Sequence, residues 1–173
     1  MSASFWWVNH SHTFRAEIEG SYLWFANKNH KSKARSESQK NTQKLLPGDV
    51  IFSFARGEVG AIGVVVGAAR EAAKPPEFEG IAEHADSHSG WVVPVRFTTL
   101  SAPLRSDEHM ADLTPVLPRK HAPILASGAS NQHMVLAAVP PTMVETLTGL
   151  LGGQVERIVN TIIEKVGDRK SVV

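Results

Sequence analysis

The chain has 173 residues, of which 42% are hydrophobic and 20% charged, and its formal net charge is +1. This composition predicts one globular domain with a core of its own. The lack of cysteine excludes disulfide frameworks, cysteine-ligated zinc and thiol nucleophiles. The longest apolar run, residues 61–69, is too short for a membrane helix, and the N-terminus lacks the pattern of a signal peptide. We therefore expect no membrane anchoring and a cytoplasmic location.

Five segments rich in β-branched and aromatic residues have the length and composition of strands. They cover residues 5–9, 50–54, 61–66, 91–98 and 134–139. Residues 46–49 (LPGD) predict a tight turn before the second of these strands, and residues 56–58 predict a hairpin turn before the third. Pro94 favours an edge or a bulge, because proline has no N–H to donate to a neighbouring strand.

Three segments predict helices. Ser106 is a suitable N-cap for a short helix over residues 106–113, and Pro141 suits the first turn of a helix that ends before Gly152 and Gly153. Residues 154–166 carry an apolar stripe at helical spacing. This stripe packs either on the domain's own sheet or on a dimer mate or following domain. We accordingly divide the chain into a domain over residues 1–152 and an amphipathic helix over 153–173, a linker or dimerisation element.

Positive charge is concentrated in residues 27–44, where six lysine and arginine side chains stand against Glu37 alone. A basic block on an otherwise slightly acidic chain is typical of a protein that binds a polyanion. A solvated loop without a partner is the alternative.

The sequence shows little sign of catalytic or metal chemistry. His10 and His12, and His84 and His88, have spacings that place each pair on one face of a strand or helix, but neither pair has a clear third ligand. The glycine-rich run 57–67 lacks the features of a phosphate loop, and no serine nucleophile motif is present. We expect no metal, no cofactor and no catalysis by this chain alone. A nucleoside-binding enzyme that uses His10 or His12 remains a rival hypothesis.

Aromatic residues accompany the predicted strands. In residues 5–9 (FWWVN), alternation places Trp6 on one face, and Trp7 with Asn9 on the other. The usual role of such rings is core packing. An aromatic ring beside an amide is also the kind of surface that stacks on a nucleobase and hydrogen-bonds to its edge.

The order of the segments FWWVN, YLW, a basic loop, LPGDVIFSF, AIGVVVGAA, PPEF, GWVVPVRF and SNQHMVL resembles an EVE domain. More closely, it resembles the EVE-like N-terminal modules of modification-dependent restriction endonucleases. The resemblance implies an α+β, PUA-like fold, in which a curved antiparallel β-barrel is flanked by short helices. It also implies a pocket for a base flipped out of DNA, often 5-methylcytosine or 5-hydroxymethylcytosine. An HNH nuclease domain usually accompanies such modules.

Carried over to this sequence, the resemblance assigns a base pocket and a phosphate-binding strip. The pocket residues are Trp7, Asn9, Trp24, Ser53, Phe54, Asn131 and Gln132. The residues expected to bind phosphate are Lys28, Lys31, Lys33, Arg35, Arg119 and Lys120. Trp91 is assigned to the core. His10, His12 and His121 depart from the pattern of related modules, and these departures affect which modification fits.

The sequence therefore predicts a binding module for duplex DNA that carries a modified cytosine, as the targeting part of a restriction or defence system. Its other expected partners are an HNH nuclease and a second copy bound through the C-terminal helix. The main alternative is an RNA-binding module, because PUA-like and YTH-like relatives use a similar barrel for modified or structured RNA.

Overall fold

The structure of the protein, a computed structural model, describes residues 3–27, 33–81 and 88–171, with the side chains of all of these except 33–36 and 166–171. A seven-stranded sheet curls around itself, with the order β2-β6-β4-β3-β1-β7, and β5 pairs with β6 beside this path. The strands are β1 (Phe5–Asn9), β2 (Tyr22–Ala26), β3 (Val50–Ala55), β4 (Glu58–Val65), β5 (Arg70–Ala73), β6 (Ser89–Arg105) and β7 (Leu136–Ala138).

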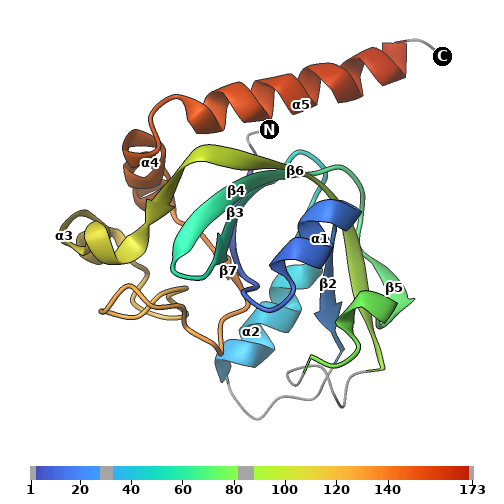
Figure 1. The fold of residues 1–173 in the computed structure, drawn as a ribbon, viewed down its shortest axis with the longest axis horizontal. Helices are drawn as coiled ribbons and strands as arrows, with labels where there is room; N and C mark the ends of the chain where they lie inside the picture. The colour runs from blue at the N-terminus through green and yellow to red at the C-terminus, as the bar shows by residue number, and fades with distance from the viewer. Residues whose placement is uncertain (1–2, 28–32, 82–87, 172–173) are drawn as a thin grey trace.

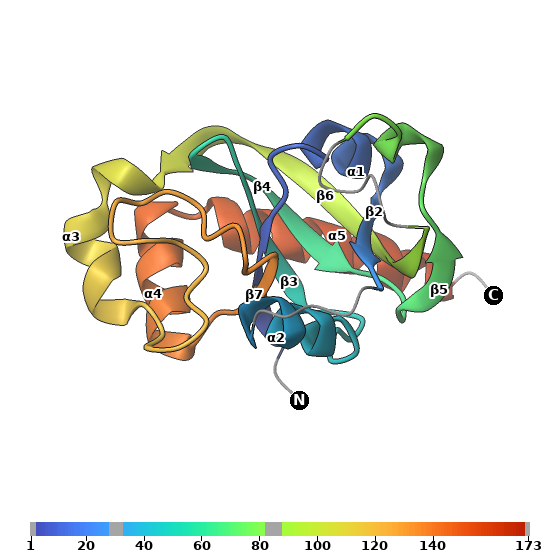
Figure 2. The ribbon, with the colours of Figure 1, turned by 90° about the horizontal axis from the view of Figure 1, so that it is seen from below.

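Helices cover both sides of the curled sheet. They are α1 (Phe14–Gly20), α2 (Lys33–Thr42), α3 (Met110–Leu113), α4 (Pro141–Leu150) and α5 (Gln154–Ser171), with short 3-10 turns η1 (Pro76–Phe78), η3 (Ser106–Glu108) and η4 (Thr114–Val116). Figure 1 shows α5 along one side of the sheet and α1 and α2 on the other. The view in Figure 2 places α2 beside β7. A curled, largely antiparallel sheet with short helices around it confirms the predicted α+β fold class.

The sheet is antiparallel except for one pair. β1 runs parallel to β3, whereas β1–β7, β2–β6, β3–β4, β4–β6 and β5–β6 are antiparallel. Antiparallel neighbours can be joined by a tight turn, as β3 and β4 are, but parallel neighbours need a longer connection. Here α1, β2 and α2 form that connection between β1 and β3.

The predicted strands are present, with altered bounds. β6 is much longer than the predicted 91–98, because it pairs first with β5 and then with β4 as the sheet curves. Its residues up to Val92 pair with β5 and those from Val95 onward pair with β4. Pro94 lies between these two segments, so its lack of an N–H costs no strand-pairing hydrogen bond to β5 or β4. β7 is shorter than the predicted 134–139. Before it, the Val135 carbonyl accepts from the Asn9 backbone N–H at 2.9 Å, and the Met134 carbonyl accepts from the Asn9 side chain at 2.8 Å.

Two helical regions differ from expectation. The basic block, expected as a loop, contains α2, and its sequence KARSESQKNT has no apolar stripe that would predict a helix. The predicted helix 106–113 is divided at His109 into η3 and α3. α4 matches the prediction closely, and α5 continues through Ser171.

Two hydrophobic clusters lie on opposite faces of the sheet. One lies between the sheet and α3, α4 and α5, and contains Trp7, while the other fills the inside of the curl and contains Trp6. Alternation along β1 thus sends the two tryptophans to different cores, and both are buried because both faces of the sheet are covered. Val155 and Ile162 of α5 are buried against the chain's own sheet, while Ile163 is exposed. Dimerisation through α5 stays a prediction.

The predicted turn before β3 is closed by a buried carboxylate. Gly48 has φ +95°, which glycine adopts without strain. Asp49, only 4% exposed, accepts hydrogen bonds from the Trp6 indole at 3.0 Å, the Leu46 N–H at 3.0 Å and the Ser4 N–H at 3.1 Å. Through these hydrogen bonds, the Asp49 side chain links the start of β1 to the start of β3.

Replacement of Asp49 by alanine is expected to lower the free energy of unfolding by about 3 kcal/mol or more, because it leaves the buried indole N–H of Trp6 without an acceptor. Asp107→Ala is the matched control, since Asp107 is exposed and its ion pair with Arg105 at 3.4 Å is a surface contact. Urea unfolding of the two variants measures the difference. Equal, small losses for both would contradict the anchoring role of Asp49.

Candidate nucleic-acid interface

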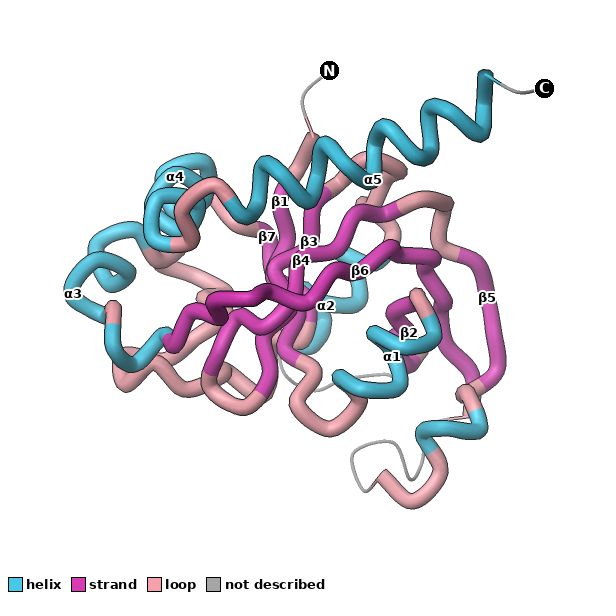
Figure 3. Tube along the Cα trace, turned by 45° about the horizontal axis from the view of Figure 1, so that its top comes forward, coloured by secondary structure: helices cyan, strands magenta, loops and turns pink. Residues whose placement is uncertain are grey.

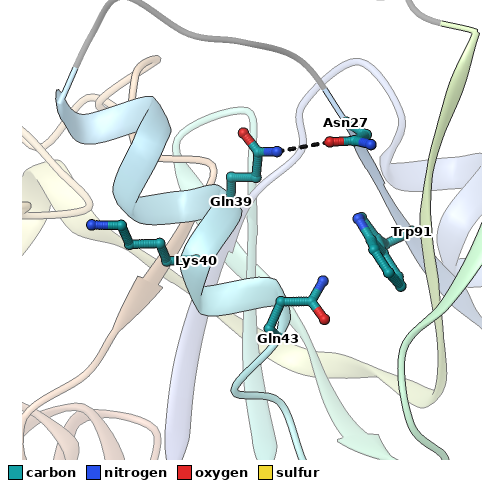
Figure 4. A pocket seen from close by; sticks show the side chains of 5 residues that line it. All are labelled: Asn27, Gln39, Lys40, Gln43 and Trp91. Carbon is teal, nitrogen blue, oxygen red and sulfur yellow. Dashed lines mark hydrogen bonds between the residues drawn. The ribbon is translucent and has the colours of Figure 1, made fainter.

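An open pocket of about 340 Å³ lies between α2 and the first residues of β6. Its lining residues are Asn27, Gln39, Lys40, Gln43 and Trp91. Figure 4 shows the indole ring of Trp91 on one side and, on the other, Gln39 of α2 and Gln43 just after that helix, with space between them. The volume falls within the range of pockets that hold small molecules.

Distant parts of the chain build this pocket. Trp91 on β6 pairs with Phe25 of β2, and Asn27 follows the end of β2. Gln39 belongs to α2 and Gln43 to the turn just after it, and both line the pocket. The Gln39 Nε2 donates a 2.8 Å hydrogen bond to the Asn27 Oδ1, which joins the two sides of the pocket.

The lining residues offer stacking, hydrogen bonding and positive charge together. Trp91 is half-buried, whereas Lys40 and Gln43 are exposed. The Trp91 indole N–H, the Gln43 amide and the Lys40 ammonium have no hydrogen-bond or ion-pair partner within the described part of the chain. None of the five lining side chains is a carboxylate. The pocket is therefore suited to a planar, polar ligand, since an aromatic face and amides both contact such a group favourably, and Lys40 adds positive charge beside it.

Several residues assigned to the base pocket instead form part of the core. Trp7 is 0% exposed and Phe54 is 1% exposed, and their rings stack with centroids 5.0 Å apart. The Trp7 indole donates a 2.9 Å hydrogen bond to the Asn9 Oδ1. In this arrangement neither ring offers a face to a base, because each is covered by the cluster between the sheet and the outer helices.

The structure brings Asn9 and Asn131 together, but their side chains bind the backbone of the segment before β7. The Asn9 Nδ2 lies 2.8 Å from the Pro123 carbonyl oxygen, 2.8 Å from that of Met134 and 3.4 Å from that of Asn131. The Asn131 side chain in turn donates to the Ala122 carbonyl at 3.0 Å. These amides satisfy backbone groups of the segment before β7. Gln132, also assigned to the pocket, is exposed on this segment.

Ser53 belongs to a buried polar network inside the curl. Its hydroxyl contacts the His10 Nε2, and the His10 Nδ1 lies 3.0 Å from the Glu17 Oε1. Glu17 also accepts hydrogen bonds from the Thr13 hydroxyl and, at 2.8 Å, from the Trp24 backbone N–H. Hydroxyl, imidazole and carboxylate follow one another as in a serine nucleophile triad. Ser53 is 0% exposed in this structure, and the network links the end of β1 with α1, β2 and β3.

Trp24 lies in a separate aromatic corner. Trp24 is 3% exposed, and its ring packs edge-on against Phe78 with the ring centroids 5.5 Å apart. Its indole N–H donates a hydrogen bond to the Ala72 carbonyl at 3.1 Å. A Cβ on Gly90 would lie 2.7 Å from the Trp24 ring, so the ring packs here only over a glycine. Tyr22 stacks on Phe78, and burial together with a hydrogen bond to Glu77 raises the pKa of the Tyr22 hydroxyl well above its ordinary value.

The predicted phosphate-binding residues divide into two groups. Lys28 and Lys31 lie outside the described residues, as do the side chains of Lys33 and Arg35 within α2. Arg119 and Lys120 are exposed on the irregular segment after η4. Phosphate binding by all six residues stays a prediction.

Sequence reasoning missed most of the pocket. It assigned Trp91 to the core, but the indole is half-buried and lines the pocket, because the covering element is a short polar helix. Gln39 and Gln43 were not assigned. Their spacing around Lys40, inside a basic block, was the available signal. Among the described residues no group of three or more His, Cys, Asp or Glu side chains is placed to hold a metal ion.

The chain matches no protein-family model and no curated protein sequence. It is similar in structure to the DUF55 domain of human thymocyte nuclear protein 1, with TM-score 0.54 and 13% identity over 86% of this chain and 98% of that chain. It is also similar to the Pho92 YTH domain in complex with m6A, with TM-score 0.52 and 12% identity over 86% of each chain. A hypothetical protein from Leishmania major gives TM-score 0.56 and 11% identity over 88% of this chain and 97% of that chain.

These likenesses extend over most of each chain and show a shared PUA-like fold. Identities this low do not carry a ligand or an activity from one protein to another, because one fold hosts many functions. Among the described residues, no helix combines the length and the apolar character needed to cross a membrane.

Trp91 is expected to supply most of the tryptophan fluorescence that acrylamide can quench, because Trp6, Trp7 and Trp24 are at most 5% exposed. Trp91→Phe should therefore lose most of the quenchable emission, whereas Trp24→Phe should lose little of it. Stern–Volmer titration of the two variants and the parent protein makes the comparison. Unchanged quenching in Trp91→Phe would mean that the ring is covered in solution.

Proposed function

We propose that this protein is a nucleic-acid-binding module that holds one unstacked, chemically modified base against Trp91. We further propose that the base is 5-methylcytosine or 5-hydroxymethylcytosine in duplex DNA. The observation that carries the proposal is the half-buried indole of Trp91, which faces the amides of Gln39 and Gln43 across an open pocket whose lining also includes Lys40. In this role the protein binds without catalysing a reaction.

The chemistry of the pocket supports a base as the ligand. Stacking on an aromatic ring contributes about 1 to 3 kcal/mol per base, and it requires one accessible ring face. The amide of Gln43 offers a donor and an acceptor side by side, which matches the edge of a cytosine or an adenine. Removing a base from a duplex costs a few kcal/mol, so stacking and edge contacts together must offset that cost.

The charge distribution supports a nucleic acid over a free base. Lys40 lines the pocket and Lys44 follows it by four residues, and both are exposed. Phosphate contacts of this kind supply affinity that does not depend on sequence, while contacts in the pocket select the base. Lys28, Lys31, Lys33 and Arg35 precede these residues in the chain and extend the proposed phosphate-binding surface.

The resemblance to EVE-like modules supports the narrower proposal. Modules of that kind target modification-dependent restriction, and an HNH nuclease domain usually accompanies them. We accordingly propose a role for this protein as the targeting part of a restriction or defence system. The proposed site differs from the one that the resemblance implied, since Trp91 takes the place of Trp24.

RNA is the second candidate ligand. The specific observation in its favour is the fold shared with the Pho92 YTH domain, whose solved structure is a complex with m6A. Stacking on Trp91 is available to a base in a single strand as well as to a flipped base, and single-stranded RNA avoids the cost of unpairing.

Binding to a panel of five oligonucleotides tests the proposal. The panel contains matched duplexes with cytosine, 5-methylcytosine or 5-hydroxymethylcytosine, and single-stranded RNA with and without m6A, all at near-physiological salt. We expect one modified duplex to bind about tenfold tighter than the cytosine duplex, which is a difference of about 1.4 kcal/mol. Equal, weak binding to the three duplexes together with a preference for m6A would contradict DNA and support RNA.

Trp91→Leu is expected to weaken binding to the preferred member of the panel by about tenfold or more, and to leave the weak, salt-dependent binding of the unmodified duplex. Phe97→Leu is the control, because Phe97 is a half-buried aromatic residue on the same strand that does not line the pocket. Circular dichroism of both variants verifies the fold.

Two results would move or remove the proposed site. Retained discrimination in Trp91→Leu, together with its loss in Trp24→Phe, would place the base at Trp24. An equal loss of binding to modified and unmodified DNA in Trp91→Leu would mean that the ring supports the surface without selecting the base.

A further inference from the structure

α2 is attached to the rest of the molecule without an apolar face. Ala34 is the only apolar residue in its sequence, KARSESQKNT. Surface helices of globular domains usually bury an apolar stripe, and a ten-residue helix without one is marginal by itself in water. Among residues 37–42 of α2, whose side chains the structure describes, the buried ones are Ser38, Asn41 and Thr42.

Two of these side chains bind the backbone of a single strand residue. The Leu136 N–H donates to the Ser38 hydroxyl at 3.3 Å, and the Asn41 Nδ2 donates to the Leu136 carbonyl at 3.0 Å. The Ser38 hydroxyl also contacts the Met134 sulfur at 3.6 Å. β7 pairs with β1 on its other side only, so Leu136 lies on an edge of the sheet that has no strand partner. α2 occupies the place of the missing strand.

The other side of α2 forms one wall of the pocket. Gln39, Lys40 and Gln43 come from this helix and the residues just after it, whereas Trp91 belongs to a strand that is paired on both sides, with β2 and with β5. Figure 3 shows β6 beside β2 and β5. One hydrogen bond among the described residues, from Gln39 to Asn27, spans the two walls. The pocket thus combines one wall on a strand that is paired on both sides with another wall that is held by polar contacts.

We infer that the docking of α2 on the edge of β7 is linked to occupancy of the Trp91 pocket. A ligand that contacts both Trp91 and the side chains of α2 binds only when α2 is docked. It therefore stabilises the docked helix, and the docked helix raises the affinity for the ligand. The effect on ligand binding rests on the proposed function, while the weak attachment of α2 is a property of the free protein.

Hydrogen exchange measured by mass spectrometry on the full chain tests both parts. In the free protein, the amides of α2 should exchange faster than those of β3, which is paired on both sides and buried along its length. Addition of the tightest-binding member of the oligonucleotide panel should slow exchange in α2.

Asn41→Ala removes one bond to β7 and leaves the Leu136 carbonyl without its partner. It is expected to raise α2 exchange in the free protein by about fivefold or more, and to weaken oligonucleotide binding by a similar factor. Asn160→Ala is the matched control, since Asn160 is an exposed asparagine in the interior of α5. It should change neither quantity.

The outcomes separate the linkage from the proposed function. Exchange in α2 as slow as in β3, or an Asn41→Ala variant with unchanged α2 exchange, overturns the weak attachment and the linkage with it. Oligonucleotide binding that leaves α2 exchange unaltered overturns the linkage alone. If no member of the panel binds, the proposed function fails, and the linkage to that ligand fails with it.

Discussion

The sheet of this protein does not close on itself, and the contact between α2 and β7 fills the opening. β2 and β7 are the end strands, and α2 contacts both. An uncovered sheet edge presents N–H and C=O groups that must be paired or hydrated, and it invites pairing with other chains. Here Ser38 and Asn41 satisfy both backbone groups of Leu136. The position of the pocket follows from this contact, because the same helix lines it.

Polar groups also determine how β1 is held within the two cores. Asp49 binds the Trp6 indole near the start of the strand, and Asn9 binds the Trp7 indole at its end. His10, the residue after β1, belongs to the buried network with Glu17 and Ser53. Burying polar groups without partners is costly, whereas matched groups fix a single arrangement. The residues that the EVE resemblance assigned to a base pocket on β1 and β3 thus have structural roles in this protein.

A shared fold and a different site are compatible. The three solved structures compared with this chain are 11% to 13% identical to it, so the backbone path is retained while the side chains differ. A curled sheet leaves openings where short elements bring side chains together. The pocket beside Trp91 is one such place, and it is lined by Gln39 and Lys40 of α2 and by Gln43 just after that helix. Function therefore has to be argued from these side chains.

The sequence by itself determined the features that depend on neighbouring residues. Alternation in residues 5–9 predicted a strand with one tryptophan on each face, Gly48 predicted the turn before β3, and the apolar stripe of α5 predicted its buried face. These patterns are local, because a strand or helix repeats its environment every two or three to four residues.

Only the tertiary structure decided which side chains are accessible and which polar groups meet. Asn9 binds residues 114 to 125 positions away, and Ser38 and Asn41 meet Leu136 about as far along the chain. α2 has no apolar periodicity, so its presence depends on those distant partners. Trp91 is half-buried because this polar helix stands beside it, and no pattern around residue 91 carries that information. The candidate site was therefore beyond local prediction, although each of its residues was visible in the sequence.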